Sequence, residues 1–362
     1  MFSYEMPTKL YFGKGCVAEA GDDVKALGSK ALLVTGRRSA KQNGSQAAVV
    51  SLLESLGIEW VLFDDVEANP SVETVRKGAA LGRQEGVDFV VGIGGGSPMD
   101  AAKVIALLCT NELDDAALFR GPYKAPLPIV AVPTTSGTGS EVTKISVLTN
   151  HSAGTKQSVK SPLLYPKLAL ADPSFTMDVP EAVTIDTAID ALSHAIEGTW
   201  PSFDAGQRRV GRRSHAVPRR SSDEPSRPLA LRCPRRPHVR LDLGRHRHFS
   251  AGTTLVHGMG YPLTYYKGLS HGRANGLLLP QYMKLMEESM ADKAERVWEI
   301  LGFSDAEDFG AFMKDLMPEV VELSNEDVAK FTAMTMKTNS VKATSYDVTA
   351  GVVSNIYKAI RR

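Results

Sequence analysis

Short apolar runs alternate with stretches of helical spacing through the first half of this chain. Strands are predicted at residues 30–36 (KALLVTG), 59–66 (EWVLFDDV) and 87–94, and a helical pattern follows each one. A helix after a strand carries the chain back along the sheet, so the next strand runs in the same direction as the first. This order therefore predicts a parallel sheet with helices on both faces. In such sheets, ligands bind beyond the carboxyl ends of the strands.

The second half of the chain carries almost no strand signal. From about residue 183 onward the segments have helical spacing, and 362 residues are too many for one small core. The sequence therefore predicts two domains, an α/β domain at residues 1–182 and an all-helical (all-α) domain at residues 183–362.

Residues 205–249 fit neither domain. The segment is rich in Arg and Pro, contains no Lys, and holds four of the eight histidines. Its few apolar residues follow neither the helical nor the strand period, so it cannot supply a core face. The composition suggests a coding sequence that is read out of frame and then restored, and an arginine-rich arm that binds nucleic acid is the alternative.

Charge and composition exclude several classes of function. Lys and Arg number 42 against 41 Asp and Glu, so the net charge provides no overall attraction to nucleic acid, and we expect no nucleic-acid partner. No run of about 18 apolar residues is present and the first residues lack the order of a signal peptide, so we expect a cytoplasmic protein with no membrane partner. Three widely spaced cysteines argue against a disulfide framework and against a cysteine-based zinc site.

Two glycine-rich loops follow predicted strands. Residues 92–103 (GIGGGSPMDAAK) pass through glycines into a helix, which lets backbone N–H groups approach a phosphate, although the spacing is not that of the Rossmann fingerprint. Residues 132–143 (VPTTSGTGSEVT) offer several hydroxyl groups. Either loop alone is compatible with a tight turn or a helix cap. Together, on neighbouring strands, they predict a dinucleotide site.

One carboxylate and three imidazoles are candidates for a metal site. Asp190 and His194 lie four residues apart in a predicted helix, and therefore on one face of it. His257 and His271 lie in apolar, glycine-rich stretches. A surface ion pair or a buried core histidine would explain each residue separately. As a group they suit a divalent iron or zinc ion with an open coordination position.

Six ordered motifs resemble those of the iron-containing (group III) alcohol dehydrogenases, a family that includes lactaldehyde reductase and 1,3-propanediol dehydrogenase. The matching stretches are KLYFGKG, GIGGGSPMDAAK, PTTSGTGSEVT, DALSHAIEG, LVHGMGYPL and GLSHGRANG. The resemblance covers essentially the whole chain except residues 205–249. It implies a dehydroquinate synthase-like architecture, with a dinucleotide-binding domain followed by a helical metal-binding domain, and it implies a homodimer.

The resemblance also assigns roles to individual residues. It implies that the metal ligands, through which catalysis acts, are Asp190, His194, His257 and His271, with Fe(II) as the expected metal and zinc as the alternative. The residues that it implies for the cofactor are Gly94, Gly95, Gly96, Ser97, Asp100, Thr134, Thr135, Ser136 and Lys156. Tyr261 stands where many members have a histidine that can assist proton transfer.

The cofactor preference depends on the residues after the strand at 30–36. Several NAD-preferring members have an aspartate there, which would bond the adenosine ribose and repel a 2′-phosphate. This chain has Gly36 instead, followed by Arg37, Arg38 and Ser39. The space at Gly36, the charge of Arg37 and the hydroxyl of Ser39 favour NADP(H) over NAD(H), unless the arginines point into solvent.

Three functions are therefore weighed. The first is a metal-dependent, NAD(P)-linked alcohol dehydrogenase or aldehyde reductase that acts on a small primary alcohol or diol. The second is a glycerol dehydrogenase-like zinc enzyme of the same fold. The third is a non-enzyme, either a chain whose metal domain is disrupted by residues 205–249 or an arginine-rich binding protein. Prolines and unpaired arginines in that segment would each cost on the order of a few kcal/mol, so we expect weak or no activity from the chain as written.

Overall fold

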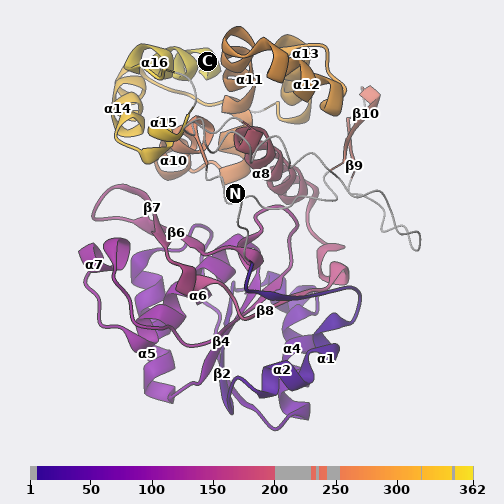
Figure 1. Cartoon of the computed structure of the whole chain (residues 1–362), viewed down its shortest axis with the longest axis vertical. Helices are drawn as coiled ribbons and strands as arrows, with labels where there is room; N and C mark the ends of the chain where they lie inside the picture. The colour runs from indigo at the N-terminus through magenta and orange to yellow at the C-terminus, as the bar shows by residue number, and fades with distance from the viewer. Residues whose placement is uncertain are drawn as a thin grey trace, which may run out of the picture. The chain divides into compact units, whose positions relative to one another are not determined.

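The strands of the first half form one parallel sheet (Figure 1). The structure is a computed structural model, which describes residues 6–199, 230–233, 236–242, 253–318, 320–344 and 347–361. Within these residues, six strands lie in the order β1-β8-β5-β4-β2-β3, and every neighbouring pair is parallel. Their bounds are β1 Lys9–Phe12, β2 Lys30–Thr35, β3 Glu59–Phe63, β4 Phe89–Gly94, β5 Ile129–Pro133 and β8 Leu168–Ala171.

Helices cover both faces of this sheet, as predicted. Successive side chains of a strand point to opposite faces, so Leu32 joins one apolar core and Leu33 the other. The first core includes residues of α5, α6 and α7, and the second includes residues of α1 to α4. The helices are α1 Cys16–Glu19, α2 Gly21–Lys25, α3 Ser39–Gln42, α4 Ser45–Ser55, α5 Val72–Glu85, α6 Gly96–Thr110 and α7 Asp115–Arg120. Three short 3₁₀ helices are η1 Ser140–Val142, η2 Pro162–Leu164 and η3 Pro173–Thr176.

An antiparallel hairpin, not expected from the sequence, follows η1. Its strands are β6 Ile145–Asn150 and β7 Thr155–Lys160. Leu148 and Val159 are fully buried in the core that also contains α6, which anchors the hairpin beside the glycine-rich loop of β4. The chain divides into two compact units, the first ending at Pro180 and the second beginning at Glu181.

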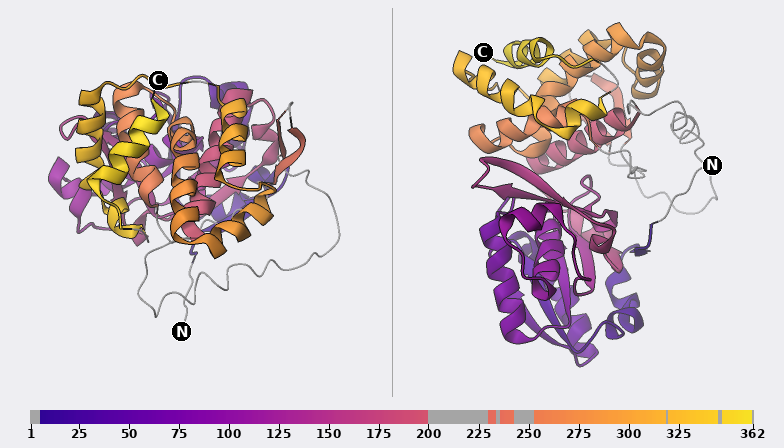
Figure 2. Two further views of the ribbon diagram at one scale, coloured as in Figure 1. Left: turned by 90° about the horizontal axis from the view of Figure 1, so that it is seen from above. Right: turned by 60° about the vertical axis from the view of Figure 1, so that its left-hand side comes forward.

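The second unit is mostly helical. Its helices are α8 Glu181–Thr199, α10 Leu255–Lys267, α11 His271–Ser289, α12 Ala291–Leu301, α13 Ala306–Leu316, α14 Asn325–Met336, α15 Asn339–Ala343 and α16 Ala350–Ile360. These helices pack side by side (Figure 2). They enclose one apolar core, in which Phe309, Phe312 and Phe331 are fully buried. Helix α11 packs against α8 and α10 and so links the segments that carry the candidate metal ligands.

One pair of short strands is the exception to the predicted all-helical second unit. Strands β9 Ala230–Cys233 and β10 Arg236–Asp242 pair antiparallel. They fall within the anomalous segment at residues 205–249, and the rest of that segment lies outside the described residues.

Candidate metal centre and cofactor loops

Helix α8 presents Asp190 and His194 on one face, as their spacing predicts. Asp190 is 5 % exposed, and His194 Nδ1 lies 2.9 Å from the backbone carbonyl oxygen of Asp190. A ring nitrogen next to a carbonyl oxygen must carry its hydrogen, so in the neutral imidazole the lone pair of His194 is on Nε2.

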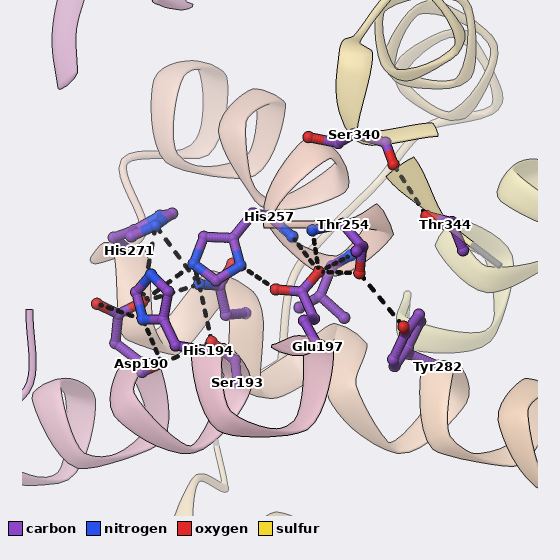
Figure 3. Close-up of polar contacts among 12 residues, drawn as sticks. Asp190, Ser193, His194, Glu197, Thr254, His257, His271, Tyr282, Ser340 and Thr344 are labelled. Atoms are coloured by element: carbon purple, nitrogen blue, oxygen red, sulfur yellow. Dashed lines mark hydrogen bonds and ion pairs between the residues drawn. The ribbon is translucent and has the colours of Figure 1, made fainter. Parts of the chain in front are cut away.

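Helices α10 and α11 bring the other two histidines to the same carboxylate (Figure 3). His257 Nε2 lies 3.5 Å from Asp190 Oδ1, and His271 Nε2 lies 3.7 Å from it. One ligand atom from each of these three residues lies within 4.8 Å of the others. His194 is not part of this closest group, but the centroid of its ring is 4.4 Å from that of His257. Asp190 and His257 are buried, whereas the His271 side chain is 25 % exposed, so the cluster lies at the edge of the interior.

Glycines allow the three helices to approach this closely. A Cβ atom on Gly272, next to His271, would lie 1.8 Å from the backbone oxygen of Asp186 on α8. A Cβ on Gly260 of α10 would lie 2.4 Å from the amide oxygen of Asn275 on α11. A side chain at position 272 would collide with backbone atoms, and one at position 260 would displace the Asn275 amide from its place, which gives a physical reason for glycine at both positions.

Two buried polar residues of the cluster were missed in the sequence. Asn275 Nδ2 lies 3.1 Å from Asp190 Oδ1 and 3.3 Å from His257 Nε2. Glu197, on α8, contacts His257 Nδ1 on the far side of the ring. For Glu197, the sequence held a signal. It follows Asp190 by seven residues and therefore lies on the same helix face.

The charges in the cluster shift the pKa values of its members. Burial alone would raise the pKa of Asp190, but the neighbouring histidines outweigh it and the pKa is lowered. Burial alone would lower the pKa of His257, but the carboxylates of Glu197 and Asp190 raise it to about 9. The pKa of His194 is lowered, chiefly by burial. A carboxylate that remains ionised beside imidazoles suits the binding of a divalent cation.

In the first unit, the glycine-rich loop leads directly from β4 into α6. Gly94 has a φ of +149°, and a Cβ on Gly95 would lie 3.1 Å from Thr135 Oγ1. Thr134 and Thr135 follow β5, so the two predicted loops do meet beside neighbouring strands. Ser136, the third predicted residue of this loop, is exposed.

Ser97 and Lys156 meet at a residue that the sequence analysis did not select. Asn69 donates its backbone N–H to Ser97 Oγ at 3.1 Å and accepts from Lys156 Nζ at 2.8 Å through its amide oxygen. Its φ of +58° is the only positive value of a non-glycine residue among those described. Lys156 is 7 % exposed.

Asp100 holds the second loop in place. It accepts from Ser140 Oγ at 2.5 Å and from the backbone N–H of Val147 at 2.8 Å. The buried Lys103, one turn further along α6, donates to Ser140 Oγ and to the carbonyl oxygen of Ile145, each at 2.8 Å. Both carboxylate oxygens of Asp100 therefore bond to the protein itself, in keeping with an organising role for this side chain.

The residues after β2 are at the surface. Gly36 is half-buried, and Arg37, Arg38 and Ser39 are exposed. The Arg37 side chain is 77 % exposed and forms an ion pair with Asp65. That partner is a second acidic residue after β3, which the sequence analysis did not weigh.

Sequence profiles of two families match the chain. The profile "Iron-containing alcohol dehydrogenase" matches residues 7–173, and the profile "Fe-containing alcohol dehydrogenase family, C-terminal" matches residues 248–360. Lactaldehyde reductase of Escherichia coli K12 is 31% identical over 312 residues, which cover 81% of this chain and 78% of that protein. NADH-dependent butanol dehydrogenase A of Clostridium acetobutylicum is 31% identical over 302 residues, which cover 78% of this chain and 75% of that protein.

Solved structures agree with these relatives. An iron-containing alcohol dehydrogenase of Thermotoga maritima superposes with a TM-score of 0.81 at 32% identity, covering 99% of both chains. Together, these matches define a metal-dependent oxidoreductase of alcohols and aldehydes. The chain belongs to the iron-containing alcohol dehydrogenase family. Membership implies iron and NAD(H) as cofactors.

No helix among the described residues is long and apolar enough to cross a membrane.

Proposed function

We propose that Asp190, His194, His257 and His271 hold one divalent metal ion, Fe(II) by family membership, in an enzyme that oxidises small primary alcohols or diols and reduces the matching aldehydes. The observation that carries this proposal is the convergence of a carboxylate and two imidazoles, from three helices, in one cluster. A surface ion pair, the simpler interpretation of Asp190 and His194, does not account for two buried members.

The distances fit a metal of this kind. Ligand atoms at 2.0–2.2 Å from a tetrahedral metal are about 3.3–3.6 Å apart, close to the 3.5 and 3.7 Å that separate Asp190 Oδ1 from the two Nε2 atoms. With Nδ1 of His194 bonded to a carbonyl oxygen, its Nε2 is the nitrogen available as a fourth ligand. The same donor set accepts zinc, which is the alternative metal.

A metal bound here would act as a Lewis acid toward the substrate oxygen. Asp190 would provide the negative charge of the site. The hydrogen bond from His194 Nδ1 to the carbonyl oxygen of Asp190 sets the orientation of the His194 ring. Tyr261, in place of the histidine found in many members, stacks on the His271 ring with centroids 5.8 Å apart. It provides no imidazole, so proton transfer would use water or the cofactor ribose hydroxyls.

For the cofactor, we propose that the pyrophosphate of NAD(P)(H) binds at Gly94, Gly95, Gly96 and Ser97, with Thr134, Thr135, Ser136, Asp100 and Lys156 completing the site. The N-terminus of α6 supplies free N–H groups and a positive dipole end for an anion. Thr135 Oγ1 is buried and has no hydrogen-bond partner among the described residues, which is consistent with a place reserved for a ligand group.

The preference for NADP(H) is a further proposal, supported by Gly36, Arg37 and Ser39. A Cβ at Gly36 would touch only the backbone oxygen of Val66, at 3.4 Å, so the position is open. An exposed ion pair such as Arg37–Asp65 is worth about 0–1 kcal/mol, so a 2′-phosphate can displace the carboxylate. Arg37→Ala should weaken NADP(H) binding at least tenfold and leave NAD(H) binding within threefold. Equal loss for both cofactors would reject the preference.

Assembly and compartment are proposed on the family resemblance. A homodimer is consistent with the edge strand β1, where Leu10 is 46 % exposed and Phe12 is 70 % exposed. Sedimentation of the full chain tests this state. The cytoplasmic location stays a prediction, which fractionation of the native cell would test.

We also propose two domains, with limits at residues 1–182 and 183–362. A further proposal is that residues 205–249 are translated from a shifted reading frame. Resequencing codons 200–252 and translating all three frames tests the second one. A different frame that gives a periodic apolar helix would support a lesion and a working restored enzyme. If only the written frame is sensible, the segment is genuine. We predict weak or no turnover for the chain as written, and family-like turnover with bound metal would reject this.

Metal binding tests the proposed centre independently of turnover. The full chain, stripped with a chelator, should bind one Co(II) or Zn(II) per chain, and Asp190→Asn should abolish this. Asp186→Asn is the matched control, because Asp186 lies one turn earlier on α8 and bonds to Ser270 and Arg273 instead of the imidazoles. Equal binding by the chain and by Asp190→Asn would reject the proposed centre.

A further inference from the structure

Glu197 is a completely buried acid with a full set of partners. The residue is 1 % exposed and lies on α8, seven positions after Asp190. Its Oε1 accepts from the backbone N–H groups of Thr254 at 3.0 Å and Val256 at 2.9 Å, and from the Thr254 hydroxyl at 2.7 Å. Its Oε2 contacts Nδ1 of His257 (Figure 3).

The first of these oxygens caps a helix that has no cap of its own. Helix α10 begins at Leu255, and the side chain of its N-cap residue Thr254 accepts no hydrogen bond from the first turn. Glu197 Oε1 accepts from three N–H groups at this end, those of Thr254, Val256 and His257, and the carboxylate charge is favourable beside the positive end of the helix dipole. Glu197 thus joins α8 to the start of α10.

The second oxygen determines which nitrogen of His257 is free. A carboxylate can only accept, so the hydrogen on Nδ1 of His257 points to Glu197. In the neutral imidazole the lone pair must then be on Nε2, the nitrogen that lies 3.5 Å from Asp190 Oδ1. The ring is therefore held with Nε2, the nitrogen that carries the lone pair, toward Asp190 of the proposed centre.

We propose that Glu197 is a positioning residue of the metal centre, which fixes the orientation and tautomer of His257 through one oxygen and docks the N-terminus of α10 on α8 through the other. This inference rests on the proposed function. Glu197 precedes residues 200–252 in the chain, and Thr254, Val256 and His257 follow them. The carboxylate therefore fastens together the two ends of the connection that contains the anomalous segment.

The two roles use different atoms, which makes them separable by substitution. In Glu197→Gln the amide oxygen can keep the bonds to the α10 backbone, while the NH₂ group replaces Oε2 beside His257. An NH₂ group donates to Nδ1, which places the imidazole hydrogen on Nε2 and blocks the proposed ligand atom. A residue with only a structural role would keep its metal affinity after this change.

The experiment compares the metal-stripped full chain with Glu197→Gln and Thr254→Val. Competition with a chromogenic chelator gives the affinity for Co(II) and Zn(II), the visible spectrum of bound Co(II) reports its ligands, and circular dichroism gives Tm. We expect Glu197→Gln to lose 10–100-fold in affinity and to alter the Co(II) spectrum, with Tm within about 3 °C of the parent chain. Thr254→Val removes one bond to Oε1 and none to His257, so it should lower Tm by about 2–4 °C and leave affinity within threefold.

Each other outcome rejects the inference. Parent-like affinity and spectrum in Glu197→Gln would show that His257 does not depend on this carboxylate. A Glu197→Gln chain that fails to fold would show that the two roles are not separable and that Glu197 is a structural residue. If the parent chain binds neither Co(II) nor Zn(II), the proposed function fails first, and the positioning role fails with it.

Discussion

Replacing Gly272 by alanine should dismantle the metal cluster without touching any of its ligands. The added Cβ would lie 1.8 Å from the backbone oxygen of Asp186, and 2.5 Å from its carbonyl carbon. Backbone atoms in the middle of a helix cannot rotate away as a side chain can. Since ordinary contacts between nonbonded heavy atoms are longer than about 3.2 Å, α11 must move away from α8 by about 1.5 Å.

That displacement has two measurable consequences. Overpacking of a core contact costs about 1–3 kcal/mol of unfolding free energy, which for a unit of this size lowers Tm by roughly 3–10 °C. His271 precedes Gly272 and moves with α11, whereas metal–ligand distances tolerate only about 0.2 Å. We therefore expect a loss of Co(II) affinity of more than 100-fold, which is larger than destabilisation alone would give.

Gly310→Ala is the matched control. Gly310 lies in α13, and a Cβ there would meet only the Pro280 side chain, at an ordinary contact distance of 3.6 Å. Because alanine is the better helix former by about 1 kcal/mol, this variant should have a Tm equal to or above that of the parent chain, with unchanged Co(II) affinity. A Gly272→Ala chain with parent-like Tm and affinity would refute the argument that the close approach of α11 to α8 builds the centre.

Three other substitutions test contacts in both units. Asp327, which bonds to Lys267 at 2.8 Å, has its pKa lowered to about 2, so its ionised form stabilises the fold above pH 4 and this stabilisation is lost as the pH falls toward 2. Asp327→Asn should therefore cost about 1 kcal/mol in urea unfolding at pH 7, a difference that shrinks below pH 4 and disappears only below pH 2. Lys103→Met leaves the carbonyl oxygen of Ile145 without its lysine partner and should cost about 3 kcal/mol in urea unfolding; a cost below about 0.5 kcal/mol would contradict this. Tyr357→Phe removes a hydroxyl that donates to a buried carbonyl oxygen at 2.8 Å, for about 1–2 kcal/mol in the same assay, and an unchanged midpoint would show that this bond contributes nothing.

The sequence predicted the fold where a periodic pattern was long enough to identify an element. The parallel sheet and its two helical layers follow from local strand–helix alternation. The hairpin at β6 and β7 was not foreseen, because six-residue strands with mixed polar residues give little signal on their own. The pairing of β1 with β8 joins residues about 160 positions apart, and such contacts depend on how the whole sheet assembles.

The site residues were predicted from their chemistry, whereas the residues that hold them were not. Asp190, His257 and His271 were selected as candidate ligands because carboxylates and imidazoles bind metals. Glu197 and Lys103 were passed over, although each is a charged residue on the same helix face as a selected residue, Asp190 and Asp100 respectively. Such a residue signals a buried partner, but its partner is set by tertiary packing: for Glu197 it lies 57 to 60 positions away.

The location of the anomalous segment decides what it can damage. All four proposed ligands, and the glycines that let α8, α10 and α11 approach, lie outside residues 205–249. The described helices also share one apolar core, and its described members lie before residue 200 or after residue 252. A harmful effect of the segment would therefore act by preventing α8 from docking on α10, and not by removing a metal ligand. Glu197 opposes such separation directly, because its carboxylate bonds to Thr254, Val256 and His257, which follow the segment in the chain.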